Sequence, residues 1–421
     1  MALGRKPIEI VKEGKHQLLA KAEHWGRIFI QDVAKIQNGY AFSSEYFTKV
    51  EGMPLIRIRD IENETTVDSF SGNFSKEFVV KRGDILIGMD GDFKVSRWKG
   101  MDALLNQRVC RIIPNSDNFD SKFLYICIQP YLDAIHAETS AVTVKHLSSK
   151  TIGEIPLPYP PLPEQQAIVA KIEELFSELE NGKQQLLTAQ EQLKVYRQSL
   201  LKWAFEGKLT YKKVKDGELP KGWKIVKLSD LGSWKGGGTP SKQVNKYWEN
   251  GTNLWVTSKD MKIGVINDSI NKITDEAILN SSANRIPKGA ILFVMRSGIL
   301  RHTFPVAIAG KDLTVNQDLQ TLSPSGLATS EFIYWFIRAF NNDIRQKCSK
   351  DGTTVESIES SSLKNYPFIL PPLQEQQLIV SELESKLTVC DKIEEIISHS
   401  LQQAETLKQS ILKKAFNGSL I

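Results

Sequence analysis

The sequence has few cysteines, no long apolar run and no large excess of charge. Its four cysteines, Cys110, Cys127, Cys348 and Cys390, lie far apart and form no CxxC pair. This spacing argues against a zinc site or a disulfide framework and is typical of a protein in the reducing cytoplasm. The longest apolar run, FLYICIQPYL at 123–132, is too short to cross a bilayer. We therefore expect a cytoplasmic protein that has no membrane partner.

The charge balance excludes little by itself. The 54 Lys and Arg residues exceed the 49 Asp and Glu residues by only five in a chain of 421 residues. Such a mild excess permits nucleic-acid binding but does not require it. The length predicts two or three domains, and the 41% of hydrophobic residues is enough to build a core in each.

Motifs of catalysis are also missing. No GxxxxGK[ST] loop occurs, because GGGTPSK lacks the required spacing, and no Asn/Asp-Pro-Pro-aromatic signature of an amino-methyltransferase is present. The six histidines show no metal-ligand spacing. We expect no catalytic residue, no metal and no cofactor in this chain.

One acidic stretch, GDILIGMDGDFKV, leaves a nuclease site open as an alternative. Asp84, Asp90 and Asp92 with Lys94 are residue types that a metal-dependent nuclease uses. The parallel stretch GAILFVMRSGIL carries Ala290 in place of Asp84 and Arg296 in place of Asp90. A solvated turn between strands explains both stretches, and we favour it.

An internal repeat is the strongest feature that is present. PPLPEQQAIVA at 160–170 and PPLQEQQLIVS at 371–381 are identical at eight of eleven positions, 211 residues apart. That spacing then holds to the end, where LLKWAFEGKL (200–209) matches ILKKAFNGSL (411–420). Before the prolines the spacing varies from 198 to 211 residues. Loops on a sheet tolerate insertions, whereas a helix packed along its length does not. The repeat therefore predicts a β-rich segment followed by a long helix, twice.

Apolar residues in the constant segments alternate in steps of four and three, which is the pattern of a coiled coil. The predicted seam consists of Ile168, Ile172, Leu179, Leu186, Leu193, Leu200, Ile379, Leu383, Ile393, Ile397, Leu407 and Ile411. Each helix is roughly 65 Å long at ~1.5 Å per residue.

Two seams in one chain are expected to pair with each other. In an antiparallel arrangement, we predict that Ile168 lies opposite Ile411 and Ile172 opposite Leu407. The two β-rich domains would then be inverted relative to each other. Inverted readers on a fixed spacer suit a bipartite site on double-stranded DNA, because twofold-related domains see the two strands equivalently.

The chain resembles the specificity subunits of type I restriction–modification enzymes. The resemblance rests on the two PPLxEQQ helix starts, the closing AFEGKL and AFNGSL, and the openings IQNGYAFSSEYF (36–47) and GSWKGGGTPSK (232–242). It covers the chain from about Trp25 to Leu420. The resemblance implies a non-catalytic subunit in which two target-recognition domains each read half of a split site. It also implies two docked adenine N6-methyltransferase subunits, ATP-driven restriction subunits, and S-adenosylmethionine, ATP and Mg bound in those partners.

The expected fold is α+β, with two mixed, mainly β domains joined by two long antiparallel coiled-coil helices and an internal pseudo-twofold repeat. The predicted segments are an unassigned N-terminus (1–24), domain 1 (25–159), helix 1 (160–207), a linker (208–222), domain 2 (223–370) and helix 2 (371–421).

DNA contacts require Arg, Lys, Asn, Gln, Ser or Thr on projecting loops. In domain 1 the candidates include Arg57 and Arg59, which we place on an alternating strand; the full set is Arg57, Arg59, Lys94, Arg97, Lys99, Thr143, Lys145 and His146. In domain 2 the candidates are Lys235, Gly237, Thr239, Lys242, Ser258, Lys259, Arg296, Arg301, His302, Thr353 and Thr354.

Paired amides recur at Asn106-Gln107 and Asn316-Gln317. Amides read adenine, but these pairs stand among apolar residues, so we favour a structural role within strands. The alternative to DNA reading is a rod-like adaptor that binds two proteins. The near-neutral charge leaves this alternative open.

Overall fold

The computed structural model describes residues 6–139, 145–211, 214, 215, 217–350 and 355–421. The chain divides into two compact units, Met1–Leu186 with His399–Ile421, and Leu187–Ser398. Two long helices, α5 (Leu162–Phe205) and α10 (Leu373–Phe416), contribute a part to each unit. Within the described ranges, no helix combines the length and apolar character that a membrane span needs.

Head 1 is the segment from residue 26 to residue 159, and its residues outside the gap at 140–144 form three β-sheets. Its strands are β1 (Gly26–Phe29), β2 (Ala34–Asn38), β3 (Phe47–Thr48), β4 (Met53–Ile56), β5 (Asp68–Phe70), β6 (Val79–Val80), β7 (Ile85–Gly88), β8 (Val95–Arg97), β9 (Ala103–Leu105), β10 (Val109–Pro114) and β11 (Pro156–Tyr159). The sheet orders are β2-β10-β7-β8, β3-β5-β4-β9-β6 and β1-β11. All pairs are antiparallel except β4 with β9.

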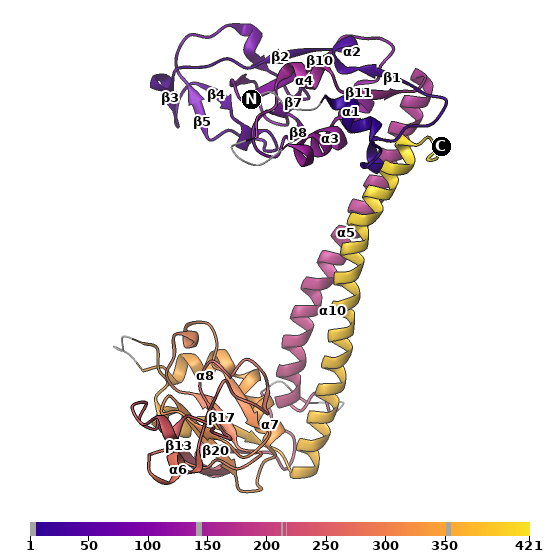
Figure 1. Cartoon of the computed structure of the whole chain (residues 1–421). Coiled ribbons are helices and arrows are strands. Elements are labelled where there is room, and N and C mark those ends of the chain that lie inside the picture. Colours follow the sequence, from indigo (N-terminus) through magenta and orange to yellow (C-terminus); the bar gives the residue numbers. More distant parts are fainter. Residues whose placement is uncertain (1–5, 140–144, 212–213, 216, 351–354) are drawn as a thin grey trace. The chain divides into compact units, whose positions relative to one another are not determined.

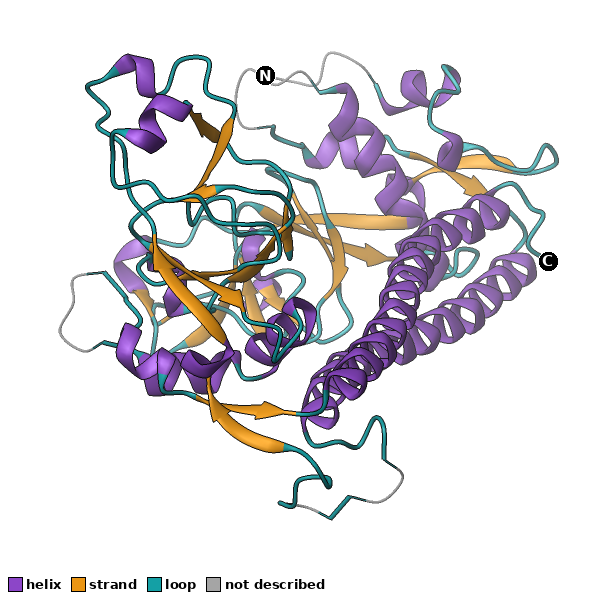
Figure 2. Ribbon diagram, turned by 90° about the horizontal axis from the view of Figure 1, so that it is seen from below, coloured by secondary structure: helices purple, strands orange, loops and turns teal. Residues whose placement is uncertain are grey.

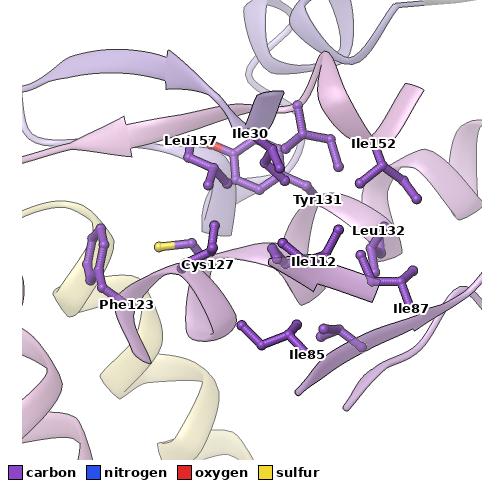
Figure 3. Packing of buried hydrophobic residues seen from close by; sticks show 14 of the residues in the cluster. Ile30, Ile85, Ile87, Ile112, Phe123, Cys127, Tyr131, Leu132, Ile152 and Leu157 are labelled. Atoms are coloured by element: carbon purple, nitrogen blue, oxygen red, sulfur yellow. The ribbon is translucent and has the colours of Figure 1, made fainter. Parts of the chain in front are cut away.

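Helices of head 1 pack against β2 and β8 of its four-stranded sheet. The helices of head 1 and of the N-terminal segment are α1 (Pro7–Lys12), α2 (Ile30–Val33), α3 (Ser121–Glu138) and α4 (Ser149–Gly153). The 3-10 turns of the same segments are η1 (Gln17–Leu19), η2 (Ser44–Tyr46), η3 (Ile58–Asp60) and η4 (Lys76–Phe78). Figure 3 shows Ile85 and Ile87 of β7 and Ile112 of β10 on the side that faces Cys127 and Leu132 of α3. Burial of these side chains is the main free-energy gain that holds α3 on the sheet.

Head 2, from residue 224 to residue 370, repeats this plan. Its strands are β12 (Lys224–Lys227), β13 (Gly232–Gly236), β14 (Asn253–Val256), β15 (Val265–Ile266), β16 (Asn271–Ile273), β17 (Ile291–Val294), β18 (Val306–Ala309), β19 (Thr314–Val315), β20 (Leu319–Pro324) and β21 (Pro367–Leu370). Its helices are α6 (Asp275–Leu279), α7 (Ser330–Ala339), α8 (Asn341–Cys348) and α9 (Ser360–Lys364), with the 3-10 turns η5 (Leu228–Leu231), η6 (Asn245–Tyr247) and η7 (Gly298–Arg301).

The sheets of the two heads have the same core topology. The order β13-β20-β17-β18-β15 in head 2 contains the counterpart of β2-β10-β7-β8 in head 1. The parallel pair β14–β19 corresponds to β4–β9, and β12–β21 corresponds to β1–β11. The internal repeat predicted from the sequence is therefore confirmed in the strand topology.

The two long helices run antiparallel within each unit, as predicted (Figures 1 and 2). In the first unit, Lys408 of α10 lies over the ring of Phe176 of α5, 5.4 Å from its centroid. Later along α5, Lys183 pairs with the earlier residue Glu405 at 2.6 Å. In the second unit, Arg197 of α5 pairs with Asp391 of α10 at 2.7 Å. As the residue number rises on one helix, it falls on the other.

The predicted register and two seam residues are wrong. The predicted register places Gln403 opposite Phe176 and Ile396 opposite Lys183. The structure places Lys408 and Glu405 there instead, five and nine residues further along α10. Leu407 and Ile393 are exposed, with 51% and 40% of their surface accessible.

The other predicted seam residues lie on inward-facing sides of the helices. Those that are buried are Ile168, Ile172, Leu193, Leu200, Ile379, Leu383, Ile397 and Ile411. Leu179 and Leu186 are partly buried.

The N-terminal segment and the linker each pack against the end of a long helix. At the end of α10, Gly418 has a φ of +75° and a Cβ added there would lie 2.8 Å from Cβ of Ala22. At the end of α5, Gly207 has a φ of +74° and its added Cβ would lie 2.4 Å from Pro220. The linker therefore packs against the end of α5. The N-terminal segment holds the matching place in the first unit.

Candidate nucleic-acid interface

Head 1 has a groove of about 610 Å³ at one end of its sheets. It is formed by the loop after β4, the turn between β9 and β10, and the loop after β2. Its lining residues are Phe42, Ser44, Phe47, Arg57, Ile58, Arg59, Asn106, Gln107 and Arg108. Three arginines and a glutamine thus gather beside aromatic side chains. This combination suits a phosphate-bearing ligand with flat, hydrogen-bonding edges.

The loop after β4 is fixed by an aspartate. Asp60 accepts a hydrogen bond from the backbone N–H of Arg57 at 3.0 Å. In head 2, Asp260 accepts the equivalent bond from the backbone N–H of Thr257 at 2.8 Å. Arg57 and Arg59 therefore project from this loop and the short turn η3. The predicted alternating strand ends earlier, at Ile56.

A second aspartate orients the two arginines of this loop. Asp68 receives Nη1 of Arg57 at 2.9 Å and Nη2 of Arg59 at 2.6 Å. The hydrogen bond from Arg57 is the main cause that lowers the pKa of the Asp68 carboxyl below its ordinary value. The Asp68 side chain is nearly buried, but both arginine side chains stay about half exposed. Their remaining N–H groups are available to a ligand in the groove.

The recurring amide pairs lie in turns, not within strands as predicted. Asn106 and Gln107 join β9 to β10, and Gln107 is exposed. The turn packs so closely that a Cβ on Gly39 would lie 2.0 Å from the carbonyl oxygen of Asn106. In head 2, a Cβ on Gly237 would lie 2.1 Å from that of Asn316. The close approach explains both glycines, and it presents the amide side chain of each glutamine at the surface.

In head 2, the glutamine of the equivalent turn makes a different contact. The Thr239 hydroxyl donates a hydrogen bond to Oε1 of Gln317. Its backbone neighbour Gly238 donates through N–H to the carbonyl of Val315 at 2.9 Å. Thr239 therefore holds the amide of Gln317 in one orientation, with the Nε2 group left as a donor.

Arg108 is a groove residue that the sequence analysis missed. Its Nη1 atom lies 3.2 Å from Oδ2 of Asp90, and Nδ1 of His146 lies 2.6 Å from Oδ1 of the same carboxylate. The carboxylate of Asp90 thus links the groove residue Arg108 to His146. Its place directly after the recurring amide pair could have identified Arg108 as a candidate. Because the pair was predicted to lie within a strand, Arg108 was not predicted to contact DNA.

The alternative of a nuclease site is not supported. Asp84 pairs with Arg111 at 2.9 Å, and Asp90 is held by Arg108 and His146. Asp92 is solvent-exposed, with 81% of its side chain accessible. In the part of the chain that the structure describes, no three His, Cys, Asp or Glu side chains are placed to hold one metal ion.

Other predicted residues of head 1 lie away from the groove. Arg97 donates to the backbone carbonyl of Ser121 at 3.0 Å and lies over the ring of Tyr125 at 5.3 Å. Lys94 and Arg97 line a second cavity of about 840 Å³, between β8, α3 and the long helices of the same unit. Lys99 is exposed, and Lys145 donates to the carbonyl of His136 at 2.7 Å.

The predicted residues of head 2 form two groups. Ser258 and Lys259 follow β14 in the places of Ile58 and Arg59, next to the turn of Gln317. Arg301 pairs with Glu356, near Arg296. His302, Lys235 and Lys242 are exposed. Thr143, Thr353 and Thr354 lie outside the described residues.

Comparison with known families gives a match to most of the chain. The family model described as type I restriction modification DNA specificity domain matches twice, at residues 22–189 and 220–403. The specificity subunit of the type I restriction enzyme EcoBI from Escherichia coli is 32% identical over 98% of this chain and 90% of its own length. The EcoR124I/EcoR124II specificity subunit from Escherichia coli is 30% identical over 73% of this chain and 74% of its own.

Solved structures share the fold. The HsdS subunit from Thermoanaerobacter tengcongensis has a TM-score of 0.62 at 17% identity, over 94% of this chain and 97% of that one. A chain from a structure on complex assembly and conformational transition of the type I R-M system has a TM-score of 0.68 at 18% identity, over 95% and 99%. This protein belongs to the family of type I restriction–modification specificity subunits.

Proposed function

We propose that each head reads one half of a bipartite site on double-stranded DNA, with residues 25–159 and 223–370 as the two target-recognition domains. The paired helices set the gap between the half-sites and dock two adenine N6-methyltransferase subunits. Restriction subunits join through that complex. S-adenosylmethionine, ATP and Mg act in those partner subunits, and this chain contributes recognition and assembly.

The repetition of one loop framework in both heads carries the proposal. Asp60 and Asp260 cap the same loop, and Gly39 and Gly237 support the same turn. Each framework projects polar side chains from loops, where base reading occurs. Local twofold axes of duplex DNA suit a chain that carries the same reading fold twice.

The side chains of the head 1 groove match the groups of DNA. Arginine pairs with the O6 and N7 acceptors of guanine, and glutamine pairs with adenine in the major groove. Arg57, Arg59 and Arg108 offer the first kind of contact, and Gln107 offers the second. The surplus N–H groups of the same arginines fit phosphate oxygens, which position a protein on the duplex.

Exposed apolar residues on α10 support the docking of partner subunits. Val389, Ile393 and Ile396 are 54%, 40% and 63% exposed, at spacings of four and three residues. This is the spacing of a helical seam, and these residues lie outside the seam that α10 forms with α5. Exposed apolar stripes of this kind mark protein interaction surfaces.

The test is selection of split sites by the chain together with its methyltransferase. A library of duplexes with random half-sites and variable gaps is offered, and the bound and methylated molecules are sequenced. We expect one split sequence with a fixed gap, and an affinity that falls steeply with salt. Binding to partner proteins with no sequence preference at any salt concentration would support the adaptor alternative instead.

A further inference from the structure

The backbone bonds at the groove define which residues of the two heads are equivalent. The N–H of Met89 donates to the carbonyl of Arg108 at 3.0 Å. In head 2, the N–H of Met295 donates to the carbonyl of Asp318 at 2.8 Å. Arg108 and Asp318 therefore occupy the same place in their heads, each directly after the exposed glutamine of the turn.

An isolated β-bridge next to this bond identifies two further pairs of equivalent positions in the two heads. Asp90 forms an antiparallel bridge with His146, and Arg296 forms the matching bridge with Ser357. In both heads, one more backbone hydrogen bond continues the pairing beyond this bridge. The bonds from Gly91 to Lys145, at 3.2 Å, and from Ser297 to Glu356, at 3.1 Å, run between equivalent backbone atoms.

The charges at these equivalent positions are reversed. Head 1 has Asp90, Arg108 and Lys145 where head 2 has Arg296, Asp318 and Glu356, in that order. The same backbone thus forms with either sign of charge. The fold does not require these side chains, which frees them to differ between two ligands.

The contacts of the two central residues show what each offers. More than half of the Arg108 side chain is exposed, and Asp90 holds it through one nitrogen at 3.2 Å. Arg108 lines the groove, and its guanidinium carries further N–H donors. Asp318 instead offers a carboxylate, of which Oδ2 accepts a bond from Nδ2 of Asn316 at 3.1 Å. Its free lone pairs accept from a donor on the ligand.

We propose that Arg108 and Asp318 are the residues that make the two half-sites different. Arg108 donates to O6 and N7 of a guanine in the half-site of head 1. Asp318 accepts from the exocyclic amino group of a cytosine or adenine in the half-site of head 2. Asp90 and His146 are positioning residues that keep the guanidinium of Arg108 directed at the base. This inference rests on the proposed function.

The test uses Arg108→Ala and Asp318→Ala, each co-expressed as the full chain with its methyltransferase, and maps methylated adenines. With Arg108→Ala we expect the preference for one guanine in one half-site to fall by roughly 5- to 150-fold, with the other half-site unchanged. Asp318→Ala should relax one position in the opposite half-site only. The matched control, Arg82→Ala, removes an exposed arginine of head 1 that does not line the groove and should change no base preference.

Two results would separate failure of this inference from failure of the proposed function. If Arg108→Ala lowers methylation equally at all sequences and keeps the wild-type preference, Arg108 holds phosphate and the inference is wrong. If the wild-type chain shows no split target, the proposed function itself fails. An Arg108→Lys variant guards against loss of folding, because it keeps the charge but loses the bidentate contact, and it should show partial loss of the guanine preference.

Discussion

The side chain of Gln165 accepts a hydrogen bond from the backbone N–H of Asp120 at 2.8 Å, and so ties the start of α5 to the start of α3. Its Nε2 group donates to the carbonyls of Pro160, at 2.8 Å, and Asn118, at 3.2 Å. Gln376 makes the same three bonds in head 2, the first to the N–H of Thr329 at 3.0 Å. The recurring PPLxEQQ motif therefore fixes the long helix to the head in each unit.

Replacing this glutamine with leucine should destabilise the protein. Gln165 is fully buried, so Gln165→Leu leaves the N–H of Asp120 and two carbonyls without partners. We expect a loss of about 2–4 kcal/mol in the free energy of unfolding. The control is Gln166→Leu, at the exposed neighbouring position, which should change the free energy by less than about 0.5 kcal/mol. Urea unfolding measures both, and equal values for the two variants would contradict the assignment.

The end of α5 gives a second prediction. The variant Gly207→Ala places a Cβ 2.4 Å from Pro220, at a position where the backbone φ is +74°. Gly217 has a similar φ of +83°, but a Cβ added there meets nothing within 4 Å. The second variant, Gly217→Ala, should cost about 1 kcal/mol, the usual penalty for a left-handed residue with a side chain. The first should cost about 1–3 kcal/mol more, because the linker must move. Thermal unfolding measures the difference in stability between the two variants. Equal stability would contradict the packing of the linker against Gly207.

The paired helices carry a polar contact that is open to a double-mutant cycle. Arg197 lies 2.9 Å from Glu394, and only a quarter of its side chain is exposed. We expect Arg197→Ala and Glu394→Ala to show a coupling of about 0.5–1 kcal/mol that weakens with added salt. The exposed pair Lys194 and Glu191 on one helix serves as the control, with a coupling of at most about 0.5 kcal/mol. A coupling for Arg197 and Glu394 no larger than the control would argue against this helix register.

Asp68 should make the stability of head 1 depend on pH in the acid range. Its pKa is lowered from the ordinary value of 3.8, first by the hydrogen bond from Arg57. A lowered pKa in the folded state stabilises the protein above the ordinary pKa, and this contribution is lost as the pH falls through the folded-state value. The difference in unfolding free energy between wild type and Asp68→Asn should therefore be constant near neutral pH and shrink below pH ~4.

Asp92→Asn is the control for this measurement, because it removes a carboxylate of head 1 whose side chain is 81% exposed. A difference for Asp68→Asn that is the same at pH ~3 as at neutral pH would mean that the carboxylate is not held by the arginines.

The sequence predicted those parts of the fold that depend on local pattern and on the repeat. The long helices begin and end close to the predicted prolines and glycines because these residues restrict the backbone locally. The seam phase of α10 was wrong at Ile393 and Leu407 because both sides of that helix carry apolar residues in steps of three and four. Only the partner helix decides which side is buried.

The groove of head 1 was harder to predict because distant segments build it. Arg108 lines the groove because it lies in the turn between β9 and β10. That turn packs against Gly39, which is about seventy residues earlier in the chain. The amide pair was assigned to a strand because its neighbours are apolar, yet those neighbours belong to two strands with a turn between them. Arg57 and Arg59, which were predicted as DNA contacts on a strand, line the groove from the loop after β4 and the turn η3.

The most direct test of the two-headed account is a swap of one head. Residues 228–366 are replaced by the corresponding segment of another family member, which keeps the β12–β21 pair and both long helices of this chain. Methylated adenines are then mapped after co-expression with the same methyltransferase. The account predicts a new sequence in one half-site, with the other half-site and the gap unchanged. A change in both half-sites would show that the heads do not read independently.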